Sequence, residues 1–137
     1  MTAIFIDTSA FLAISNKKDE HHEEAVEFLK SIMDGKRFTR IVTSDYVIDE
    51  TVTRIRFAVG HGGAVGWLKN IEASGVLEVL RVNEEIFERS IELFKKYSDK
   101  SLSFTDCTSF ALMEKKKIMH SFTFDGDFEK AGFVKYP

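Results

Sequence analysis

Five carboxylates stand where a parallel α/β fold would bring their side chains together. Asp7 ends the apolar run AIFID, and Asp125 and Asp127 follow a second apolar run within FTFDGDF. Asp106 opens an apolar helical segment, and Glu50 lies in a helical segment after another strand. Carboxylates that converge raise one another's pKa, and Mg²⁺ or Mn²⁺ relieves that repulsion through oxygen ligation. The pattern therefore predicts metal-assisted phosphoryl transfer, in which a metal ion activates water and stabilises the leaving oxygen.

Most of these acids also have a purely structural interpretation. Asp106 could only cap a helix, which contributes about 0.5–2 kcal/mol, and the two acids of FDGDF could be turn residues. Glu50 could form an exposed i,i+4 pair with Arg54, worth about 0.2–0.5 kcal/mol. Asp7 is harder to explain in this way, because a charge at the end of an apolar strand is costly unless it is paired, hydrogen-bonded or metal-bound.

The elements that must position these acids alternate between strand and helix. Apolar, β-branched runs predict strands over residues 3–7, 40–43, 76–82 and 121–124, and a short one over 133–135. Helical periodicity and capping residues predict helices over 10–13 after Ser9, 19–36, 46–59, 65–73 after a glycine-rich turn, 84–97, and 106–116 after Thr105. This alternation predicts a three-layer α/β/α sandwich with a mainly parallel central sheet of four to five strands. Ligands of such sheets bind at the carboxyl ends of the strands.

Composition indicates one ordinary globular domain over residues 1–137. Hydrophobic residues make up 44% and charged residues 30% of the chain. A single cysteine, Cys107, excludes an intrachain disulfide and favours a buried thiol in a reducing, cytoplasmic compartment. No apolar run is long enough for a transmembrane helix, so no membrane association is expected. The net charge of −3 argues against a broadly basic nucleic-acid binder, although four acids held in a metal site would leave the remainder close to neutral.

In this order and at these distances, the motifs resemble the PIN domain (PilT N-terminal) family of small nucleases. The resemblance covers essentially the whole chain and rests on IFIDTSAFLA, DETVTRIR, LSFTDCTSFAL and FTFDGDF. Within that family the sequence is most similar to VapC-type toxin ribonucleases. The stretch ETVTRIRFAVGHGGAVGWL resembles their helical clip, and FDGDFEKAGF resembles their C-terminal motif.

The resemblance implies a Mg²⁺- or Mn²⁺-dependent endoribonuclease, the toxin of a type II toxin–antitoxin pair. A metal-activated water would cleave RNA and leave a 5′-phosphate and a 3′-hydroxyl. Implied partners are RNA, a second copy of the chain in a homodimer, and an antitoxin protein. The implied catalytic and metal-binding residues are Asp7, Glu50, Asp106 and Asp125, with Asp127 as a reserve ligand. Supporting hydroxyls would come from Thr8, Ser9 and Thr105, and phosphate contacts from Arg54 and Arg56.

Two other functions fit parts of the pattern. A PIN-fold RNA-binding or assembly module would keep the fold without useful catalysis. A haloacid-dehalogenase-type enzyme would use Asp7 as a nucleophile, but such enzymes usually carry a second aspartate two residues later, where this chain has Ser9. Physical reasoning alone also leaves open the choices between Asp49 and Glu50 and between Asp125 and Asp127.

Overall fold

The computed structural model describes residues 2–98 and 101–137 and contains one five-stranded sheet. Its strands are β1 (Ala3–Ile6), β2 (Arg40–Ser44), β3 (Leu77–Leu80), β4 (His120–Phe122) and β5 (Val134–Tyr136). Their order across the sheet is β3-β2-β1-β4-β5, and every neighbouring pair is parallel. The predicted parallel sheet is therefore confirmed, with β1 at its centre.

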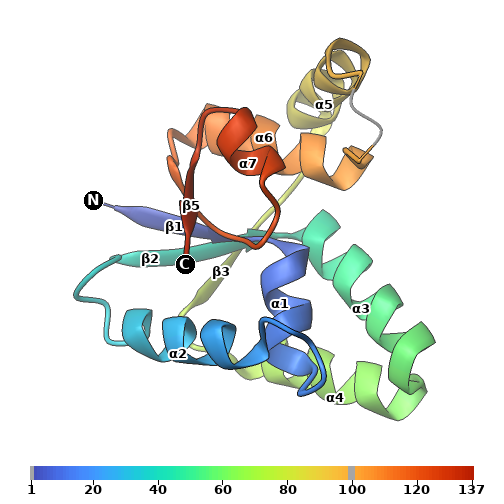
Figure 1. The fold of residues 1–137 in the computed structure, drawn as a ribbon. Helices are drawn as coiled ribbons and strands as arrows, with labels where there is room; N and C mark the ends of the chain where they lie inside the picture. Colours follow the sequence, from blue (N-terminus) through green and yellow to red (C-terminus); the bar gives the residue numbers. More distant parts are fainter. Residues whose placement is uncertain (1, 99–100) are drawn as a thin grey trace.

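Helices cover both faces of the sheet and confirm the three-layer architecture. In Figure 1, α5, α6 and α7 lie above the strands, α1, α2 and α4 lie below them, and α3 runs along one side. The helices are α1 (Thr8–Ser15), α2 (His22–Ile32), α3 (Asp45–Val59), α4 (His61–Ala73), α5 (Glu84–Lys96), α6 (Phe104–Lys116) and the short α7 (Asp127–Lys130). None of the helices in the described ranges has the combined length and apolar character that crossing a membrane requires.

The central strands are buried because their apolar runs pack against helices on both faces. All four residues of β1 are buried, and Phe5 and Phe122 are fully inaccessible. The Phe28 ring of α2 meets the Phe122 ring edge-on at 4.7 Å between centroids. A continuous apolar strand is the expected pattern for a parallel sheet covered on both sides.

Helix starts differ from the predictions at two site-bearing positions. Helix α1 begins at Thr8 with Asp7 in the N-cap position, so Ser9 lies inside the helix and does not cap it. Helix α6 begins at Phe104 and is capped by Ser103, so the prediction of Thr105 as its cap was wrong. The reason is a reciprocal capping box, in which the Ser103 hydroxyl accepts from the Asp106 N–H and the Asp106 carboxylate accepts from the Ser103 N–H.

The glycine-rich segment is mostly helical, which the sequence did not predict. Helix α4 starts at His61, so the connection to α3 is confined to Gly60, whose φ of 93° lies in the region that favours glycine. Gly63 then allows the start of α4 to pass close to the end of α3, because a Cβ there would lie 2.6 Å from Val59 Cγ2. Packing of α4 against α3 therefore outweighs the low helix propensity of glycine.

The cap of α3 gives a direct test of how this helix is held. The Ser44 hydroxyl accepts a 3.0 Å hydrogen bond from the buried Val47 N–H. We expect Ser44→Ala to lower the unfolding free energy by about 1 kcal/mol and Tm by about 3–5 °C, measured by thermal denaturation. Thr53→Ala, at an exposed position of the same helix, is the control and should leave Tm unchanged or slightly higher. Equal Tm values for the two variants would contradict the capping role.

Candidate active site

The carboxylate of Asp7 is buried at the end of the central strand. Asp7 is 3% exposed, and its Oδ2 accepts hydrogen bonds from the hydroxyls of Thr123 (2.9 Å) and Ser9 (3.0 Å). Burial raises the pKa of Asp7 to about 6, although these two hydrogen bonds act in the opposite direction. The charge of Asp125 adds a smaller upward effect on the same pKa. The pKa of Asp7 therefore lies close to neutral pH, and two hydroxyl groups donate to one oxygen of its carboxylate.

Thr123 connects the acid after β1 to the acid after β4, and sequence reasoning missed this residue. Its hydroxyl oxygen accepts from the Asp125 N–H at 3.0 Å while the hydroxyl donates to Asp7. Ser9 forms a parallel link, since its oxygen accepts from the Phe124 N–H at 3.0 Å. These hydroxyls tie the segment after β4 to the segment after β1. The only sequence signal was a threonine two residues before Asp125, at the end of a predicted strand.

Asp106 both caps a helix and faces the other acids. Its Oδ2 accepts from the Ser103 N–H at 3.0 Å, and the residue is 7% exposed. Burial is the largest cause that raises the pKa of Asp106 to about 7, followed by the charge of Asp7, with a smaller contribution from Asp125. Asp106 therefore has both of the predicted roles. One carboxylate oxygen caps α6, and the charge of the carboxylate interacts with the other acids.

Asp125 and Asp127 have different surroundings. Burial is the largest cause that raises the pKa of Asp125, and the charge of Asp127 adds to it. The Asp127 N–H donates to Asp125 Oδ1 at 2.9 Å. The buried Asp127 carboxylate accepts from the Ser101 hydroxyl at 2.8 Å and lies 3.7 Å from the Lys130 ammonium. Asp127 is thus engaged in holding this turn, whereas Asp125 faces the other acids.

The structure gives less support for the predicted roles of Glu50 and of the hydroxyls of Thr8 and Thr105. Glu50 is half-buried on α3, and no described residue forms a hydrogen bond or ion pair with it. The described ranges contain no group of three or more His, Cys, Asp or Glu side chains arranged closely enough to hold a metal ion. Thr8 Oγ1 is buried with no hydrogen-bond partner among the described residues, and Thr105 accepts from the Thr108 hydroxyl only through its carbonyl. The ligand assignment remains a prediction.

The two arginines proposed to contact phosphate lie on the exposed face of α3. Arg56 Nη1 contacts His61 Nδ1 at 3.1 Å, and Arg54 borders a small hollow that Asp19 also lines. Within the described part of the chain, neither arginine forms an ion pair with the aspartates of the site. Cys107 is fully buried, and burial raises its pKa to about 11, so its thiol stays protonated.

The sequence of nearly the whole chain matches a known family. A sequence profile described as the PIN domain matches residues 4–134 of this chain. The chain belongs to the PIN domain family. The PIN fold places the carboxyl ends of β1 and β4 side by side in the middle of the sheet, which explains why residues about 120 positions apart share one hydrogen-bond network.

Individual relatives of this PIN domain are named as ribonucleases. A Mycobacterium tuberculosis protein named 23S rRNA-specific endonuclease VapC20 is 36% identical over 132 residues, which is 96% of each chain. The crystal structure of VapC20, described as a sarcin–ricin loop cleaving toxin, superposes with a TM-score of 0.85 over 96% of both chains. A VapC ribonuclease of Archaeoglobus fulgidus is 29% identical over 117 residues, covering 85% of this chain and 73% of that protein. VapBC2 of Rickettsia felis, 14% identical with a TM-score of 0.68 over 98% of each chain, shares the fold.

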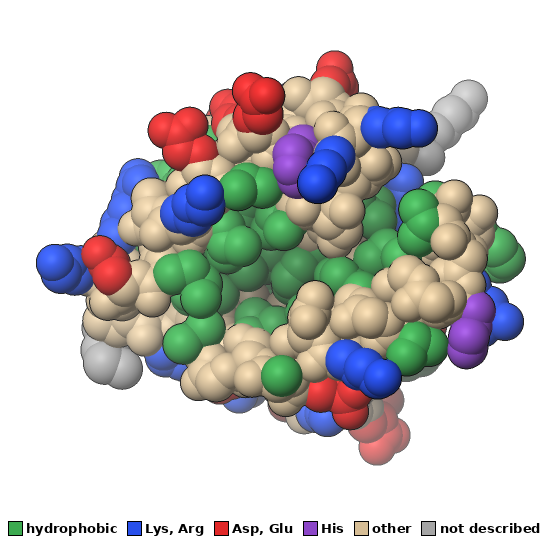
Figure 2. All heavy atoms as spheres, turned by 90° about the horizontal axis from the view of Figure 1, so that it is seen from below, with side chains coloured by type: hydrophobic (Ala, Val, Ile, Leu, Met, Phe, Trp, Pro, Cys, Tyr) green, Lys and Arg blue, Asp and Glu red, His purple; other side chains and the backbone are tan. Residues whose placement is uncertain are grey.

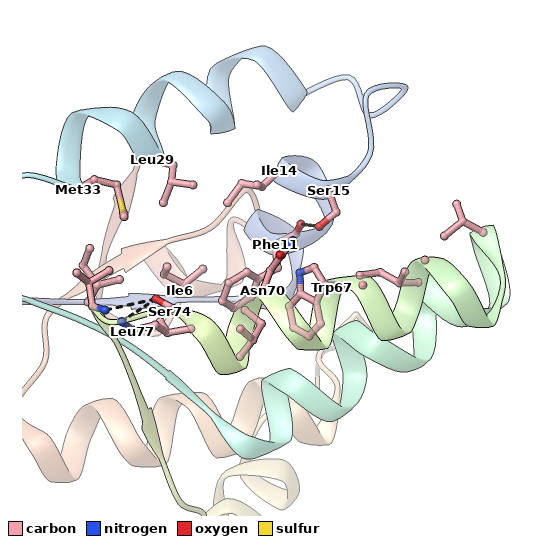
Figure 3. Close-up of a pocket in the computed structure, with 17 residues that line it drawn as sticks. Ile6, Phe11, Ile14, Ser15, Leu29, Met33, Trp67, Asn70, Ser74 and Leu77 are labelled. Atoms are coloured by element: carbon pink, nitrogen blue, oxygen red, sulfur yellow. Dashed lines mark hydrogen bonds between the residues drawn. The ribbon is translucent and has the colours of Figure 1, made fainter.

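The PIN domain also carries an apolar groove on the face away from α5 and α6. Figure 2 shows this face, on which hydrophobic side chains line a hollow between α2 and α4. The groove has a volume of about 560 Å³. In Figure 3, Leu29 and Met33 of α2 face Trp67 and Ile6 across it, and the Trp67 ring meets the Phe11 ring edge-on at 5.4 Å. Met33, on this groove, is 47% exposed, so the apolar lining is open to solvent.

The raised pKa values predict how pH affects stability. The pKa of Asp106 is higher in the folded chain than its usual 3.8, so the folded state binds its proton more tightly than the unfolded state. Asp106 therefore adds to the free energy of unfolding as the pH falls below about 7. This contribution is lost as the pH rises through about 7. We expect Asp106→Asn to be more stable than wild type at pH 8 in EDTA, by roughly 1–3 kcal/mol, because it removes a buried charge and keeps an oxygen that can accept from Ser103.

Thermal denaturation of both proteins between pH 8 and pH 5 checks this expectation. The difference in Tm should shrink as the pH falls, since wild-type Asp106 becomes neutral. Glu88→Gln changes an exposed carboxylate on α5 and is the control, with a small difference in Tm that does not vary over this range. An Asp106→Asn variant that is less stable than wild type at pH 8 would contradict the account.

Proposed function

We propose that this chain is a Mg²⁺- or Mn²⁺-dependent endoribonuclease that acts in the cytoplasm as the toxin of a type II toxin–antitoxin pair. The observation that carries the proposal is the convergence of Asp7, Asp106 and Asp125, whose pKa values are all raised. A purely structural role would not favour two buried acids and a partly buried third whose charges repel one another. Perturbed acids that share one site are typical of catalytic centres.

The donor chemistry fits a hard divalent cation. All the acids of the site offer carboxylate oxygens, which Mg²⁺ and Mn²⁺ prefer. A cation would offset the repulsion that adds to the effect of burial on their pKa values. Asp7, Glu50 and Asp106 would hold the ion, with Asp125 holding a second ion or ordering its water shell. A bound ion would lower the pKa of a water and stabilise the leaving oxygen.

The surrounding residues would keep the acids ionised and would fix the orientation of their carboxylates. Thr123 and Ser9 donate to Asp7 Oδ2, so a cation would be bound through the other oxygen of this carboxylate. The Asp127 N–H orients Asp125, so we assign Asp127 to positioning and leave ligation to Asp125. In the cleavage step, a water oxygen forms a bond to phosphorus as the bond from phosphorus to the 3′-oxygen breaks. The 3′-oxygen takes up a proton, and the products carry a 5′-phosphate and a 3′-hydroxyl.

The relatives support RNA as the substrate. VapC20, at 36% identity over 96% of both chains, is named as an endonuclease specific for 23S rRNA. Its structure is described as that of a toxin that cleaves the sarcin–ricin loop. Structured ribosomal RNA with an exposed loop is therefore the first substrate class to test for this chain.

We assign the apolar groove between α2 and α4 to an antitoxin segment. An open groove of about 560 Å³ lined by aliphatic and aromatic side chains suits the apolar face of a partner helix. VapBC2 of Rickettsia felis, solved bound to a DNA fragment from its promoter, shares this fold. A second copy of the chain would pair elsewhere, through side chains such as Phe57, which is 83% exposed and does not line the groove.

Cleavage of RNA with matched controls tests the nuclease. We expect the purified protein to cut a sarcin–ricin loop RNA in Mn²⁺, and to leave 5′-phosphate ends that a phosphate-dependent exonuclease can degrade. Asp7→Asn should reduce the rate by at least about 100-fold, because it removes a charge where the ion would bind, and EDTA should abolish cutting. Gel electrophoresis of end-labelled RNA measures all three.

The outcomes separate the two functions that the fold allows. Loss of cutting in Asp7→Asn and in EDTA would support the metal-dependent nuclease. RNA binding without cutting in Mn²⁺, on both structured and single-stranded RNA and with no antitoxin present, would favour the RNA-binding or assembly module. Cutting that persists unchanged in EDTA would overturn the metal assignment while leaving a nuclease.

The groove assignment predicts a position-specific effect on antitoxin binding. We expect Met33→Glu to weaken binding of the protein encoded beside this gene by at least about tenfold, since it places a charge in an apolar contact. Val134→Glu, at a residue of β5 that is 44% exposed and outside the groove, is the matched control. Isothermal titration calorimetry measures both. Equal affinities for the two variants would place the antitoxin elsewhere.

A further inference from the structure

A second pocket lies on the opposite layer of the molecule, between α5, α6 and the segment that follows α7. It has a volume of about 480 Å³, within the range of small-ligand sites. Its residues are mostly apolar or basic, and no described acid other than Glu114 lines it. The pocket is separate from the apolar groove between α2 and α4, with which it shares no residue.

The walls of this pocket are aromatic. Tyr97, Phe110 and Phe133 line it, and the Phe110 and Phe133 rings are nearly parallel, with centroids 5.7 Å apart. The Tyr97 ring meets Phe110 edge-on at 6.2 Å. Tyr97 and Phe133 are each partly exposed, so part of each ring can be reached from solvent. Nucleobases stack on such side chains without strict sequence preference.

The rim of the pocket carries positive charge that the protein leaves largely unbalanced. The lining acid Glu114 is bound at two points by Arg89, with N···O distances of 3.0 and 3.2 Å. Lys96 and Lys117 are exposed, and neither forms an ion pair with a described residue. The Lys96 ammonium lies 5.6 Å from the centre of the Tyr97 ring, so it sits beside the aromatic wall. A ligand with both a planar ring and an anionic group would match this arrangement.

Lys117 occupies a backbone position that normally favours glycine. It ends α6 with a φ of 57°, and it is the one residue other than glycine with positive φ in the described ranges. Glycine or asparagine commonly fills this position because a side chain there is strained. A lysine at this position places its ammonium on the rim of the pocket at the expense of local backbone strain.

The pocket is also connected to the acidic site. Phe110 lies one helical turn after Asp106, about 6 Å along the axis of α6. The same ring contacts Phe128 edge-on at 4.9 Å, directly after Asp127. Lys117, at the other end of α6, is about 16 Å further along the helix axis than Asp106, so an RNA strand would have to span that length to reach both the acids and the pocket.

We propose that this pocket binds an unpaired nucleotide of the RNA that the enzyme cleaves, with the base against Tyr97 and Phe133 and a phosphate between Lys96 and Lys117. This inference rests on the proposed ribonuclease function, since it names a second contact for the same substrate. It would make recognition depend on an unpaired base at a set distance from the cleaved bond. Structured RNA with an exposed loop can supply such a base, whereas a continuous duplex cannot.

Binding of adenosine 5′-monophosphate in EDTA tests the pocket without any cleavage. We expect amide resonances of Lys117, Gly132 and Phe133 to shift in NMR titrations, with a Kd on the order of 1 mM. Inorganic phosphate is the second probe and should bind the same residues at least about fivefold more weakly. Equal affinities of the two probes would overturn the base contact. Absence of shifts, or shifts confined to the residues around Asp7 and Asp106, would overturn the site.

Charge variants test the same pocket with RNA. Lys117→Gly removes the ammonium and relieves the positive φ, so its Tm should equal or exceed that of wild type. We expect it to weaken binding of a single-stranded oligonucleotide in EDTA by about 3–10-fold and to reduce the salt dependence of log K by about 0.7, as for one lost phosphate contact. Lys116→Gln changes the neighbouring exposed lysine, which does not line the pocket, and is the matched control. Equal losses in the two variants would show general charge attraction and overturn the site.

The two proposals fail in different ways. A protein that binds the nucleotide in the pocket but does not cut RNA in Mn²⁺ would overturn the nuclease and keep the pocket as a binding site. A protein that cuts RNA, loses cutting in Asp7→Asn, and shows no response to Lys117→Gly would keep the nuclease and overturn the pocket.

Discussion

The buried carboxylate of Asp7 is the constraint on which the active site depends. It lies at the end of β1, the central strand of the sheet, where burial alone would make a charge costly. This cost is offset by the hydroxyls of Thr123 and Ser9, which donate to one oxygen of the Asp7 carboxylate. The same hydroxyl oxygens accept from the backbone after β4, so the hydrogen bonds that hold Asp7 also set the position of Asp125. One buried acid therefore organises the junction of two distant segments.

Bringing these acids together lowers the stability of the folded chain. The pKa values of Asp7 and Asp106 are raised to about 6 and about 7, chiefly by burial, and each acid also feels the charge of another. The fold limits this cost by giving Asp106 a second role in the capping box with Ser103, which stabilises the start of α6. Asp127 contributes in a similar way, since it secures the turn that carries Asp125. These acids are thus integrated into the fold, and the proposed cation would offset the repulsion that remains between their charges.

The layered architecture separates two kinds of surface. Below the sheet, an open groove between α2 and α4 is almost entirely apolar, which suits the hydrophobic face of a protein segment. Above the sheet, the pocket beside α6 combines aromatic walls with the exposed ammonium groups of Lys96 and Lys117, which form no ion pair with a described residue, and this combination suits the nucleotide proposed above. The acids lie at the edge of the sheet where the strands end. A partner protein and an RNA strand could therefore be bound on opposite layers of one small domain.

The sequence by itself determined the class of fold and the four acid-bearing motifs, because apolar runs ending in Asp7 and Asp125 and the alternation of strand and helix are local patterns. It misassigned the caps of α1 and α6 and the glycine-rich start of α4, because those boundaries depend on reciprocal hydrogen bonds and on packing against α3. Only the tertiary structure decided that Thr123 supports Asp7 and that Asp127 braces the turn after β4. Burial, hydrogen bonding and mutual repulsion are properties of groups brought together from remote parts of the chain, so no local pattern could contain them.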